Sequence, residues 1–400
     1  MRAAIVACLL VGCGRFEFDS LGDSRRDDDG GDGIVGGSRV VEVSSANAFA
    51  TTSSTFEDVT GGRLSITPDY ANQPWVILVS AGISSDSGAE IAVEVQLLVD
   101  GVPRGLGGAQ TNLPTDRNSY AAFDVLRGDT STHVVQLQLR DAAGSTSRVT
   151  DFHLLAFSLP MGAELLYAED LGQRIVPVGF LPYVTIDVTP QSPGDYLILG
   201  GVSATEAPSG SNVGVHIVDP QQNIWPENEL YFNHRTPWYA FLWARVVHLD
   251  VPGTFRLEAE GDVSPSTIQM ARLAAIRTNA FDAVESTEDL PTASSTSTTG
   301  EVRSSVVTAA PPGPRDYVVL QHLAFEVHTT TFNQGALFKR DGTTIGSSEF
   351  FTASAGNHAG LVSSTRTAQP MTLTTEMYVT DASADARGFE SVIHALRLRP

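Results

Sequence analysis

An internal repeat of about 120 residues is the feature that most constrains how this chain can fold. An aromatic residue leads an apolar stretch at residues 75–78, 196–199 and 317–320, and the leading residues Trp75, Tyr196 and Tyr317 are 121 positions apart. Other markers keep the same order, since the pair Glu169-Asp170 returns as Glu288-Asp289. A fixed period of this length predicts one structural unit built three times.

The pattern inside each copy predicts strands. Apolar and polar residues alternate at 135–139, 255–259 and 371–375, turn signals such as Asp100-Gly101 recur every eight to twelve residues, and no segment sustains a long helical period. The fold class we expect is all-β, with three tandem antiparallel β-sandwich domains at 39–160, 161–282 and 283–400. Immunoglobulin-like and jelly-roll arrangements both fit, and the long apolar first and last strands favour a jelly-roll-like sandwich.

The closing strand of each copy, at 152–159, 268–276 and 392–398, resembles the closing strand of domains in the tumour-necrosis-factor and complement-C1q class. Jelly-roll domains of that class commonly assemble as trimers of single-domain subunits. The resemblance therefore implies that the three domains of this chain pack around a pseudo-threefold axis, with apolar contact between the first and the third.

Cysteine and charge narrow the function classes. The only cysteines, Cys8 and Cys13, lie in the first thirteen residues, so the domains contain no disulfide and no thiolate metal site and depend on hydrophobic packing. The formal net charge of -21 opposes general attraction to nucleic acid or to an anionic membrane surface.

The N-terminus has the features of an export signal. Arg2 precedes an apolar stretch at 3–11 that is too short to span a bilayer, which predicts a signal peptide at 1–12. The segment Leu10-Val11-Gly12-Cys13 resembles the lipobox of bacterial lipoproteins. That resemblance implies cleavage before Cys13, lipid on its thiol and attachment to a membrane of the cell envelope; Gly14 favours the outer over the inner membrane. Residues 13–38 are rich in Gly and Asp, which predicts a disordered, flexible acidic tether.

Motifs of catalysis are absent from the sequence. It contains no G-x-S-x-G, no H-E-x-x-H, no P-loop and no G-x-G-x-x-G that opens a helix, so we assign no catalytic residue, no metal ligand and no cofactor. His153 and His394 are interpreted as equivalent positions of two copies, with Arg272 in the third, and therefore as structural residues. His322 and His328 could share one face of a strand, and we assign them to structure as well.

Aromatic residues crowd into one segment of the second copy. Three of the four tryptophans lie between 225 and 243. Exposed Trp and Tyr side chains provide stacking surfaces for sugars and anchors for protein partners. The alternative is that both faces of this segment are covered, one by the sandwich core and one by a neighbouring domain. The candidate binding residues are Trp225, Tyr231, Trp238, Tyr239 and Trp243.

Together these features predict a membrane-anchored lipoprotein outside the cytoplasm that has a non-catalytic structural or binding role. A glycan-binding or partner-binding adhesin that uses the aromatic segment is one alternative. A carbohydrate-active enzyme on a β-scaffold is another, and it would need paired carboxylates among residues such as Glu227, Glu229 and Asp250.

Overall fold

The computed structural model describes residues 37–86, 91–111, 118–142, 144–205, 213–232, 239–261, 266–289, 293–327, 333–351, 356–380 and 386–400. These residues belong to one compact unit, Asp32–Pro400. The predicted signal peptide, Cys13 and all but the last two residues of the predicted tether lie outside them. Within these ranges the regular structure is strands and one short 3-10 turn, η1 (Thr278–Ala280), and no helix is long and apolar enough to cross a membrane.

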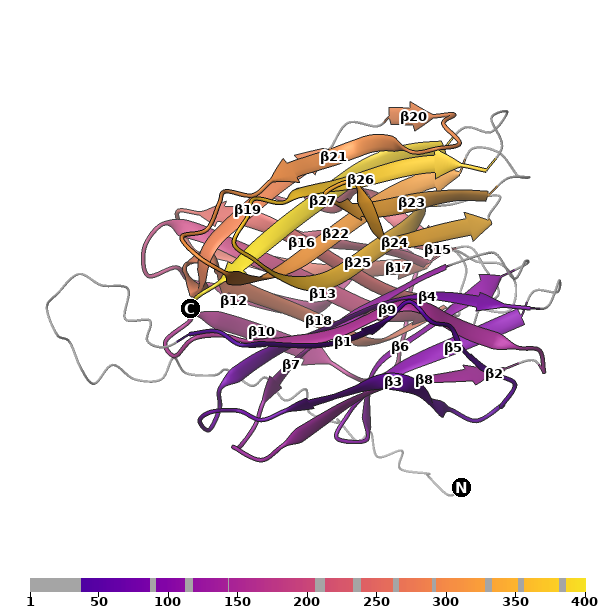
Figure 1. The fold of residues 1–400 in the computed structure, drawn as a ribbon, viewed down its shortest axis with the longest axis horizontal. Helices are drawn as coiled ribbons and strands as arrows, with labels where there is room; N and C mark the ends of the chain where they lie inside the picture. The colour runs from indigo at the N-terminus through magenta and orange to yellow at the C-terminus, as the bar shows by residue number, and fades with distance from the viewer. Residues whose placement is uncertain are drawn as a thin grey trace, which may run out of the picture. The chain divides into compact units, whose positions relative to one another are not determined.

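Nine strands form the first sandwich, called sandwich 1 (Figure 1). One sheet has the order β1-β9-β4-β7, with β2 also paired to β9, and the other has the order β3-β8-β5-β6. The strands are β1 (Val40–Ser45), β2 (Phe49–Thr51), β3 (Glu57–Ile66), β4 (Pro74–Ser85), β5 (Ile91–Val99), β6 (Val102–Thr111), β7 (Asn118–Arg127), β8 (His133–Asp141) and β9 (Ser147–Ser158).

Sandwich 2 repeats this order. Its sheets are β10-β18-β13-β16, with β11 paired to β18, and β12-β17-β14-β15. The strands are β10 (Leu165–Asp170), β11 (Arg174–Ile175), β12 (Leu181–Val188), β13 (Gly194–Thr205), β14 (Val213–Val218), β15 (Ile224–Phe232), β16 (Tyr239–Leu249), β17 (Gly253–Gly261) and β18 (Thr267–Arg277).

Sandwich 3 follows the same plan once more. Its sheets are β19-β27-β22-β25, with β20 paired to β27, and β21-β26-β23-β24. The strands are β19 (Phe281–Asp289), β20 (Ala293–Ser295), β21 (Glu301–Val307), β22 (Arg315–Val327), β23 (Asn333–Arg340), β24 (Thr343–Phe351), β25 (Gly356–Thr367), β26 (Thr372–Val379) and β27 (Ala386–Leu398).

The strand order identifies each sandwich as a jelly roll. If β1 and β2 are counted as one interrupted edge strand, the first, eighth, third and sixth strands form one sheet and the second, seventh, fourth and fifth form the other. All pairings are antiparallel. The predicted fold class, all-β with antiparallel jelly-roll-like sandwiches, is confirmed.

The aromatic-led repeat corresponds to the central strands β4, β13 and β22. In β4, Trp75, Ile77 and Val79 belong to the core of sandwich 1, whereas Val76 and Leu78 belong to a different apolar cluster. All five side chains are fully buried. A strand that is buried on both faces needs apolar residues in unbroken succession, which explains why these segments do not alternate.

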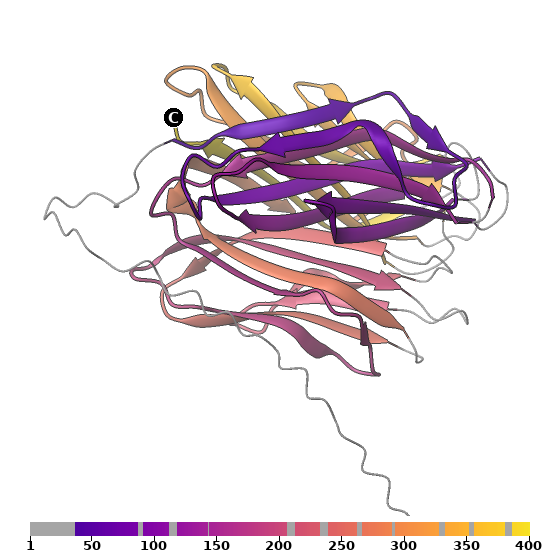
Figure 2. The same cartoon turned by 90° about the horizontal axis from the view of Figure 1, so that it is seen from below.

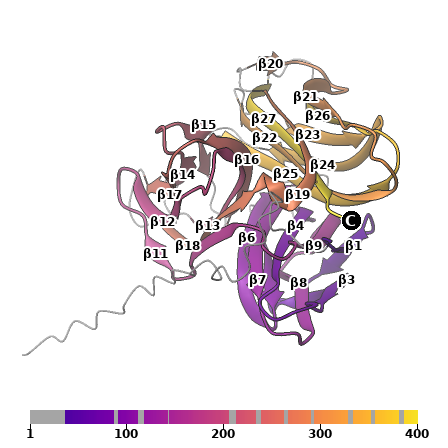
Figure 3. The ribbon, with the colours of Figure 1, turned by 90° about the vertical axis from the view of Figure 1, so that its left-hand side faces the viewer.

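The second apolar cluster, here called the shared core, has members from all three sandwiches. Figures 2 and 3 show the three sandwiches beside one another. It forms where the outer faces of the β4, β13 and β22 sheets meet. Each buried aliphatic or aromatic side chain of this kind contributes about 1.5–3 kcal/mol to stability. Its members include Val76, Leu78, Phe123, Phe157, Leu197, Leu199, Leu242, Ile276, Val318, Leu320, Val362 and Leu396.

The sandwiches contact one another in a cyclic order. The β6 and β7 edge of sandwich 1 contacts the β13 sheet of sandwich 2, the β15 and β16 edge of sandwich 2 contacts sandwich 3, and the β24 and β25 edge of sandwich 3 contacts sandwich 1. The Leu106 amide donates to Ser203 Oγ (3.2 Å) at the first contact, and the Val362 amide donates to Ser80 Oγ (3.1 Å) at the third. Sandwiches 1 and 3 therefore touch directly although all of sandwich 2 separates them in the sequence.

One close approach at the first contact requires glycine. A Cβ atom at Gly201 on β13 would lie 3.0 Å from the ring of Phe123 on β7. Glycine at this position lets the Phe123 ring from sandwich 1 pack directly on the backbone of sandwich 2.

Replacement of Phe123 by alanine should remove a buried aromatic ring from this contact. We expect the Phe123→Ala variant to lose about 3–5 kcal/mol of unfolding free energy, measured by urea denaturation, because a buried ring leaves a cavity. Val178 is 75% exposed, and Val178→Ala serves as the control, with a change within about 0.5 kcal/mol. Equal stability of the two variants would contradict the shared core.

Candidate functional site

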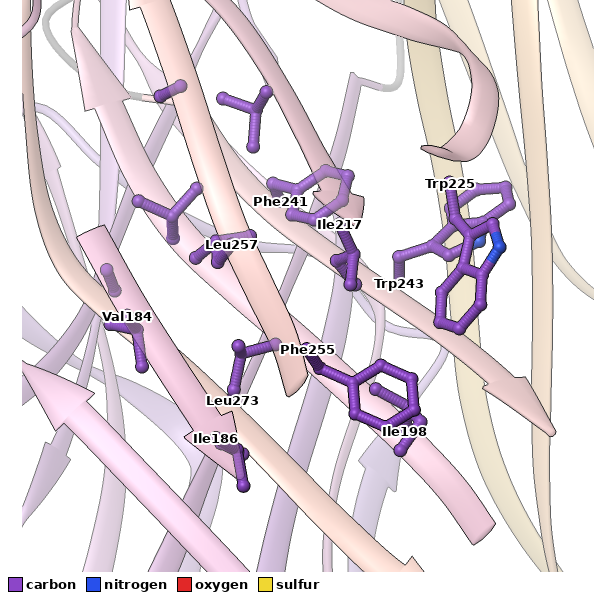
Figure 4. Packing of buried hydrophobic residues seen from close by; sticks show 14 of the residues in the cluster. Val184, Ile186, Ile198, Ile217, Trp225, Phe241, Trp243, Phe255, Leu257 and Leu273 are labelled. Atoms are coloured by element: carbon purple, nitrogen blue, oxygen red, sulfur yellow. The ribbon is translucent and has the colours of Figure 1, made fainter. Parts of the chain in front are cut away.

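Two of the predicted binding residues, Trp225 on β15 and Trp243 on β16, lie inside the protein. Their side chains are 1% and 0% exposed. Figure 4 shows both indoles in the packed interior of sandwich 2, where Trp225 lies against Phe255 with ring centroids 5.9 Å apart. Stacking on a sugar requires an exposed ring, so the prediction that these two tryptophans form an exposed binding surface is corrected.

Of the other three predicted binding residues, one packs on a core and two have side chains that the structure does not describe. Tyr239 is half-buried and packs on the core of sandwich 2. Tyr231 has its backbone in β15, but its side chain lies outside the described part, and Trp238 lies entirely outside it. Along β16, Phe241 and Trp243 belong to the core of sandwich 2, whereas Leu242 and Ala244 belong to the shared core. Both faces of β16 are thus covered.

A cluster of buried histidines lies where sandwich 2 meets sandwich 3. The ring of Trp243 is 5.4 Å, centroid to centroid, from His322 on β22 and also 5.4 Å from His358 on β25. His322 Nδ1 lies 3.2 Å from His358 Nε2, within hydrogen-bond distance. His394 on β27 donates from Nε2 to the carbonyl oxygen of Ala244 (3.2 Å). We call His322, His358 and His394 the histidine cluster.

Burial keeps the histidine cluster neutral at pH 7. His322 and His394 are fully buried, and His358 is 6% exposed. Burial lowers the pKa of His322 well below its ordinary value, lowers that of His358 to about 3, and lowers that of His394 to about 4. The cause is the cost of moving a charged imidazolium out of water into an apolar interface.

The interpretation of His153 and His394 as equivalent positions is wrong. His153 pairs with Ser80 and Arg272 pairs with Gly201 in the corresponding sheets. In sandwich 3, Val392 has this place, because it pairs with His322, whereas His394 pairs with Leu320. Strand register, and not sequence spacing, decides which residues are equivalent. His328 lies outside the described residues.

A charged network joins sandwich 1 to sandwich 2. The buried carboxylate of Asp124 on β7 accepts a hydrogen bond from Arg104 Nε (2.6 Å) and lies 3.3 Å from Arg272 Nε. The Tyr167 hydroxyl is 3.0 Å from Asp124 and 2.6 Å from Glu169. Burial, with the nearby charge of Asp124 second, raises the pKa of Tyr167 well above its ordinary value. The network therefore combines two guanidinium groups with two carboxylates at one contact.

The other two contacts carry different polar groups. Arg245 on β16 of sandwich 2 lies 3.0 Å from Glu288 on β19 of sandwich 3. At the contact between sandwiches 3 and 1, the Ser364 amide donates to Glu42 (3.1 Å), and Glu42 also lies 2.8 Å from His153. In the sequence, Glu169 and Glu288 are markers of the repeat. In the structure, they lie at the contacts of sandwich 2 with sandwich 1 and with sandwich 3.

A surface cavity of about 500 Å³ lies on sandwich 2. Its rim brings together the end of β12, the turn after β14 and the start of β17. Arg256 contributes a guanidinium that is 2.7 Å from Glu258 and 3.0 Å from Gln222. The lining residues are Asp187, Val188, Thr189, Pro220, Gln222, Pro252, Gly253, Thr254 and Arg256.

Within the part of the chain that the structure describes, no three side chains of the types His, Cys, Asp and Glu come together in a way that could hold a metal ion. The histidine cluster is a packing and hydrogen-bonding group.

Comparison with solved structures gives matches of low similarity. No family model and no curated protein matches it. A chain of an archaeal virus with a triple jelly roll fold and turret assembly aligns with 90% of this chain and 90% of its own length, at 10% identity and a TM-score of 0.20. The tandem CBM22-1–CBM22-2 domain of Xyn10C from Paenibacillus barcinonensis aligns with 60% of this chain and 92% of its own length, at 12% identity and a TM-score of 0.20. The fold assignment therefore depends on the strand order described above.

Removal of the central carboxylate tests the network between sandwiches 1 and 2. We expect Asp124→Asn to cost about 3–5 kcal/mol of unfolding free energy, because Arg272, whose side chain is 3% exposed, loses the nearer of two carboxylate partners and keeps Glu169 at 3.5 Å. The matched control is Asp316→Asn, which breaks the pair with Arg366, a side chain that is 68% exposed. That pair should contribute about 0–1 kcal/mol. Similar losses in urea denaturation for both variants would contradict the assignment.

Proposed function

We propose that this chain is a lipid-anchored lipoprotein of the cell envelope with a non-catalytic, structural or binding role, in which three jelly-roll sandwiches act as one rigid display unit. The shared core is the single observation that carries this proposal. Domains linked only by flexible segments, or by small polar contacts, move independently. An apolar cluster with members from all three sandwiches opposes such motion, because separation would expose it to water.

The cyclic contacts support a more specific form of the proposal. Heterologous contacts, in which one edge meets the neighbour's face, close into a ring when the rotation is complete. Three sandwiches of one chain would then take the place of three separate subunits, as the resemblance to trimer-forming jelly-roll domains implies. The Ser38 amide donates to the Arg399 carbonyl oxygen (3.0 Å), so the third contact lies where the described ends of the chain meet.

The anchor in this proposal is lipid on Cys13. Its support is the segment Leu10-Val11-Gly12-Cys13, which follows a short apolar stretch and precedes an acidic, Gly-rich segment. Two or three acyl chains give stable membrane attachment, whereas one gives only marginal binding. The acidic net charge leaves lipid as the source of membrane affinity, since an anionic surface would repel the chain. We assign the outer membrane as the preferred location.

Substitution of the lipidated residue tests the anchor. We expect the wild-type chain to sediment with membranes and to carry a diacylglyceryl mass on an N-terminal Cys13 peptide, and we expect Cys13→Ser to be soluble and unmodified. Cys8→Ser is the matched control and should behave as the wild type. Membrane sedimentation of an unlipidated Cys13→Ser protein would overturn the proposed anchor, as would a mature N-terminus at another residue.

We propose ligand binding at the cavity of sandwich 2 as the second candidate function. The cavity has the volume of a small-ligand site, and it combines the proline rings of Pro220 and Pro252 with the polar groups of Asp187, Thr254 and Arg256. This mixture suits a polar ligand such as a sugar, with rings as an apolar wall and fixed donors for hydroxyl groups.

A glycan array of the wild-type chain tests this second candidate. Arg256→Ala should reduce any glycan binding about tenfold or more, since a hydrogen bond to a charged group contributes about 1.5–3 kcal/mol. Arg366→Ala, on sandwich 3 and far more exposed, is the control and should not change binding. Trp238→Ala distinguishes the cavity from the aromatic segment, because a loss with Trp238→Ala alone would assign binding to that segment.

A further inference from the structure

We propose that His322, His358 and His394 form an acid-operated latch, which holds sandwich 3 on sandwich 2 at neutral pH and releases it when the imidazoles take up protons. The proposal does not depend on the lipid anchor or on the cavity. It concerns one contact of the cyclic arrangement, and the other two contacts contain no comparable group of buried histidines among the residues described.

The hydrogen bond between His322 and His358 requires at least one neutral ring. His322 Nδ1 and His358 Nε2 are 3.2 Å apart, so one nitrogen donates its proton and the other accepts it with a lone pair. Full protonation would place N–H groups on both facing nitrogens. The two rings, stacked with centroids 5.3 Å apart, would then carry like charges. Both rings belong to sandwich 3 and lie against Trp243 of sandwich 2, so in acid the repulsion arises directly at the contact.

Two ring nitrogens have no acceptor for an added proton. His322 Nε2 and His394 Nδ1 are both buried, and neither has a hydrogen-bond partner in the described part of the protein. A proton on either nitrogen is unsatisfied unless water enters, and water reaches these atoms only if the contact opens. The aromatic ring of Trp243 beside His322 offsets part of the cost of the charge, but it accepts no conventional hydrogen bond.

The latch histidines all belong to sandwich 3, and the groups that they contact across the interface belong to β16 of sandwich 2. His322 and His358 pack on the ring of Trp243 from sandwich 2, and Phe241 of the same strand lies 5.9 Å from His358. His394 bonds to the Ala244 carbonyl oxygen, also on β16. Protonation therefore acts on the β16 edge of sandwich 2, and movement of this edge away from sandwich 3 would hydrate all three rings.

The charged groups described nearest to the cluster on sandwiches 2 and 3 are one cation and two carboxylates. On β16, Arg245 lowers the pKa of His394 further by charge repulsion, after the larger effect of burial. The carboxylates nearest to this contact are Glu288 on β19 and Glu390 on β27, which lie 3.0 Å and 4.0 Å from Arg245 and so already face a cation. The side chains at 227–232 of β15, which include Glu227 and Glu229, lie outside the described part.

The elements of sandwich 1 that pack against β25 place their charges in other interactions. On β1 and β9, Glu42 and His153 bind each other. On β7, Asp124 pairs with Arg104. The β7 residues that approach Gly360 of β25 are Ser119 and Ala121, which carry no charge. On β24 of sandwich 3 itself, Glu349 accepts from the Tyr378 hydroxyl (3.0 Å). None of these interactions includes a latch histidine.

The direction of the pH effect follows from the two protonation states. Above about pH 6.5, the ordinary pKa of histidine, the rings are neutral in both the open and the closed forms, and the latch is fully effective. Below that pH the hydrated rings of the open form bind protons, while burial keeps the pKa of His394 near 4 and that of His358 near 3 in the closed form. The closed form is therefore lost progressively as the pH falls from 6.5 towards 4.

Energy transfer between dyes on the two sandwiches tests the latch in the full chain. Val178 on sandwich 2 and Val307 on sandwich 3 are 75% and 64% exposed. Cysteines introduced there, with Cys8→Ser and Cys13→Ser, give two labelling sites. Transfer should be constant from pH 8 to pH 6.5, fall at lower pH and recover on return to neutral pH, while far-ultraviolet circular dichroism keeps its strand signal. Each histidine should change the ratio of closed to open protein by up to about tenfold per pH unit, so three give up to about 1000-fold.

Matched variants decide whether the histidine cluster is responsible. In the double variant His322→Gln/His358→Gln, the change in the ratio of closed to open protein should fall to about tenfold per pH unit. In His394→Gln, which keeps an amide donor for the Ala244 carbonyl oxygen, this change should fall to about 100-fold per pH unit. His248→Gln is the control, because His248 is exposed and pairs with Asp195. The single His394 variant tests the latch even if the double variant does not fold. Constant transfer down to pH 4, unchanged pH curves in the variants, or loss of transfer only together with the strand signal would overturn the proposal.

Discussion

Burial of one sheet face of each sandwich against the other two is the constraint on which the rest of the structure depends. A jelly roll needs only its inner faces to be apolar, and its outer faces can be solvated. Here the outer faces of the β4, β13 and β22 sheets are apolar as well, and they meet in the shared core. Once they meet, one edge of each sandwich lies against the next sandwich, so the contacts close in a cycle. The two requirements together explain the near-continuous apolar runs of the central strands.

Polar groups distinguish the three contacts that the apolar residues make similar. Arg104, Asp124 and Arg272 mark the first, Arg245 and Glu288 the second, and Ser364 and Glu42 the third. A buried charge is stable only opposite its own partner, because any other pairing leaves it unsatisfied. The different groups at equivalent places therefore favour one order of packing among three sandwiches of the same fold.

The histidine cluster is a further group of buried polar side chains, and it lies at the contact between sandwiches 2 and 3. Neutral imidazoles pack as aromatic rings and share hydrogen bonds, so they fit an apolar interface at pH 7. Their protonation changes the same interface from apolar to charged without any change in covalent structure. The proposed lipoprotein would in this way combine a rigid display unit with one contact that responds to its chemical environment.

Sequence by itself determined the fold class and the three-fold repeat, because hydrophobic periodicity and turn residues are local signals that each copy carries independently. It also grouped three of the four tryptophans in one segment, and it left open whether both faces of that segment are covered. Only the tertiary structure decided that Trp225 and Trp243 are interior and that His394 has no equivalent in His153. It alone brought Asp124 to Arg272, and His322 to Trp243. These outcomes depend on strand register and on packing between sandwiches, which arise from contacts between residues far apart in the chain and leave no local pattern in the sequence.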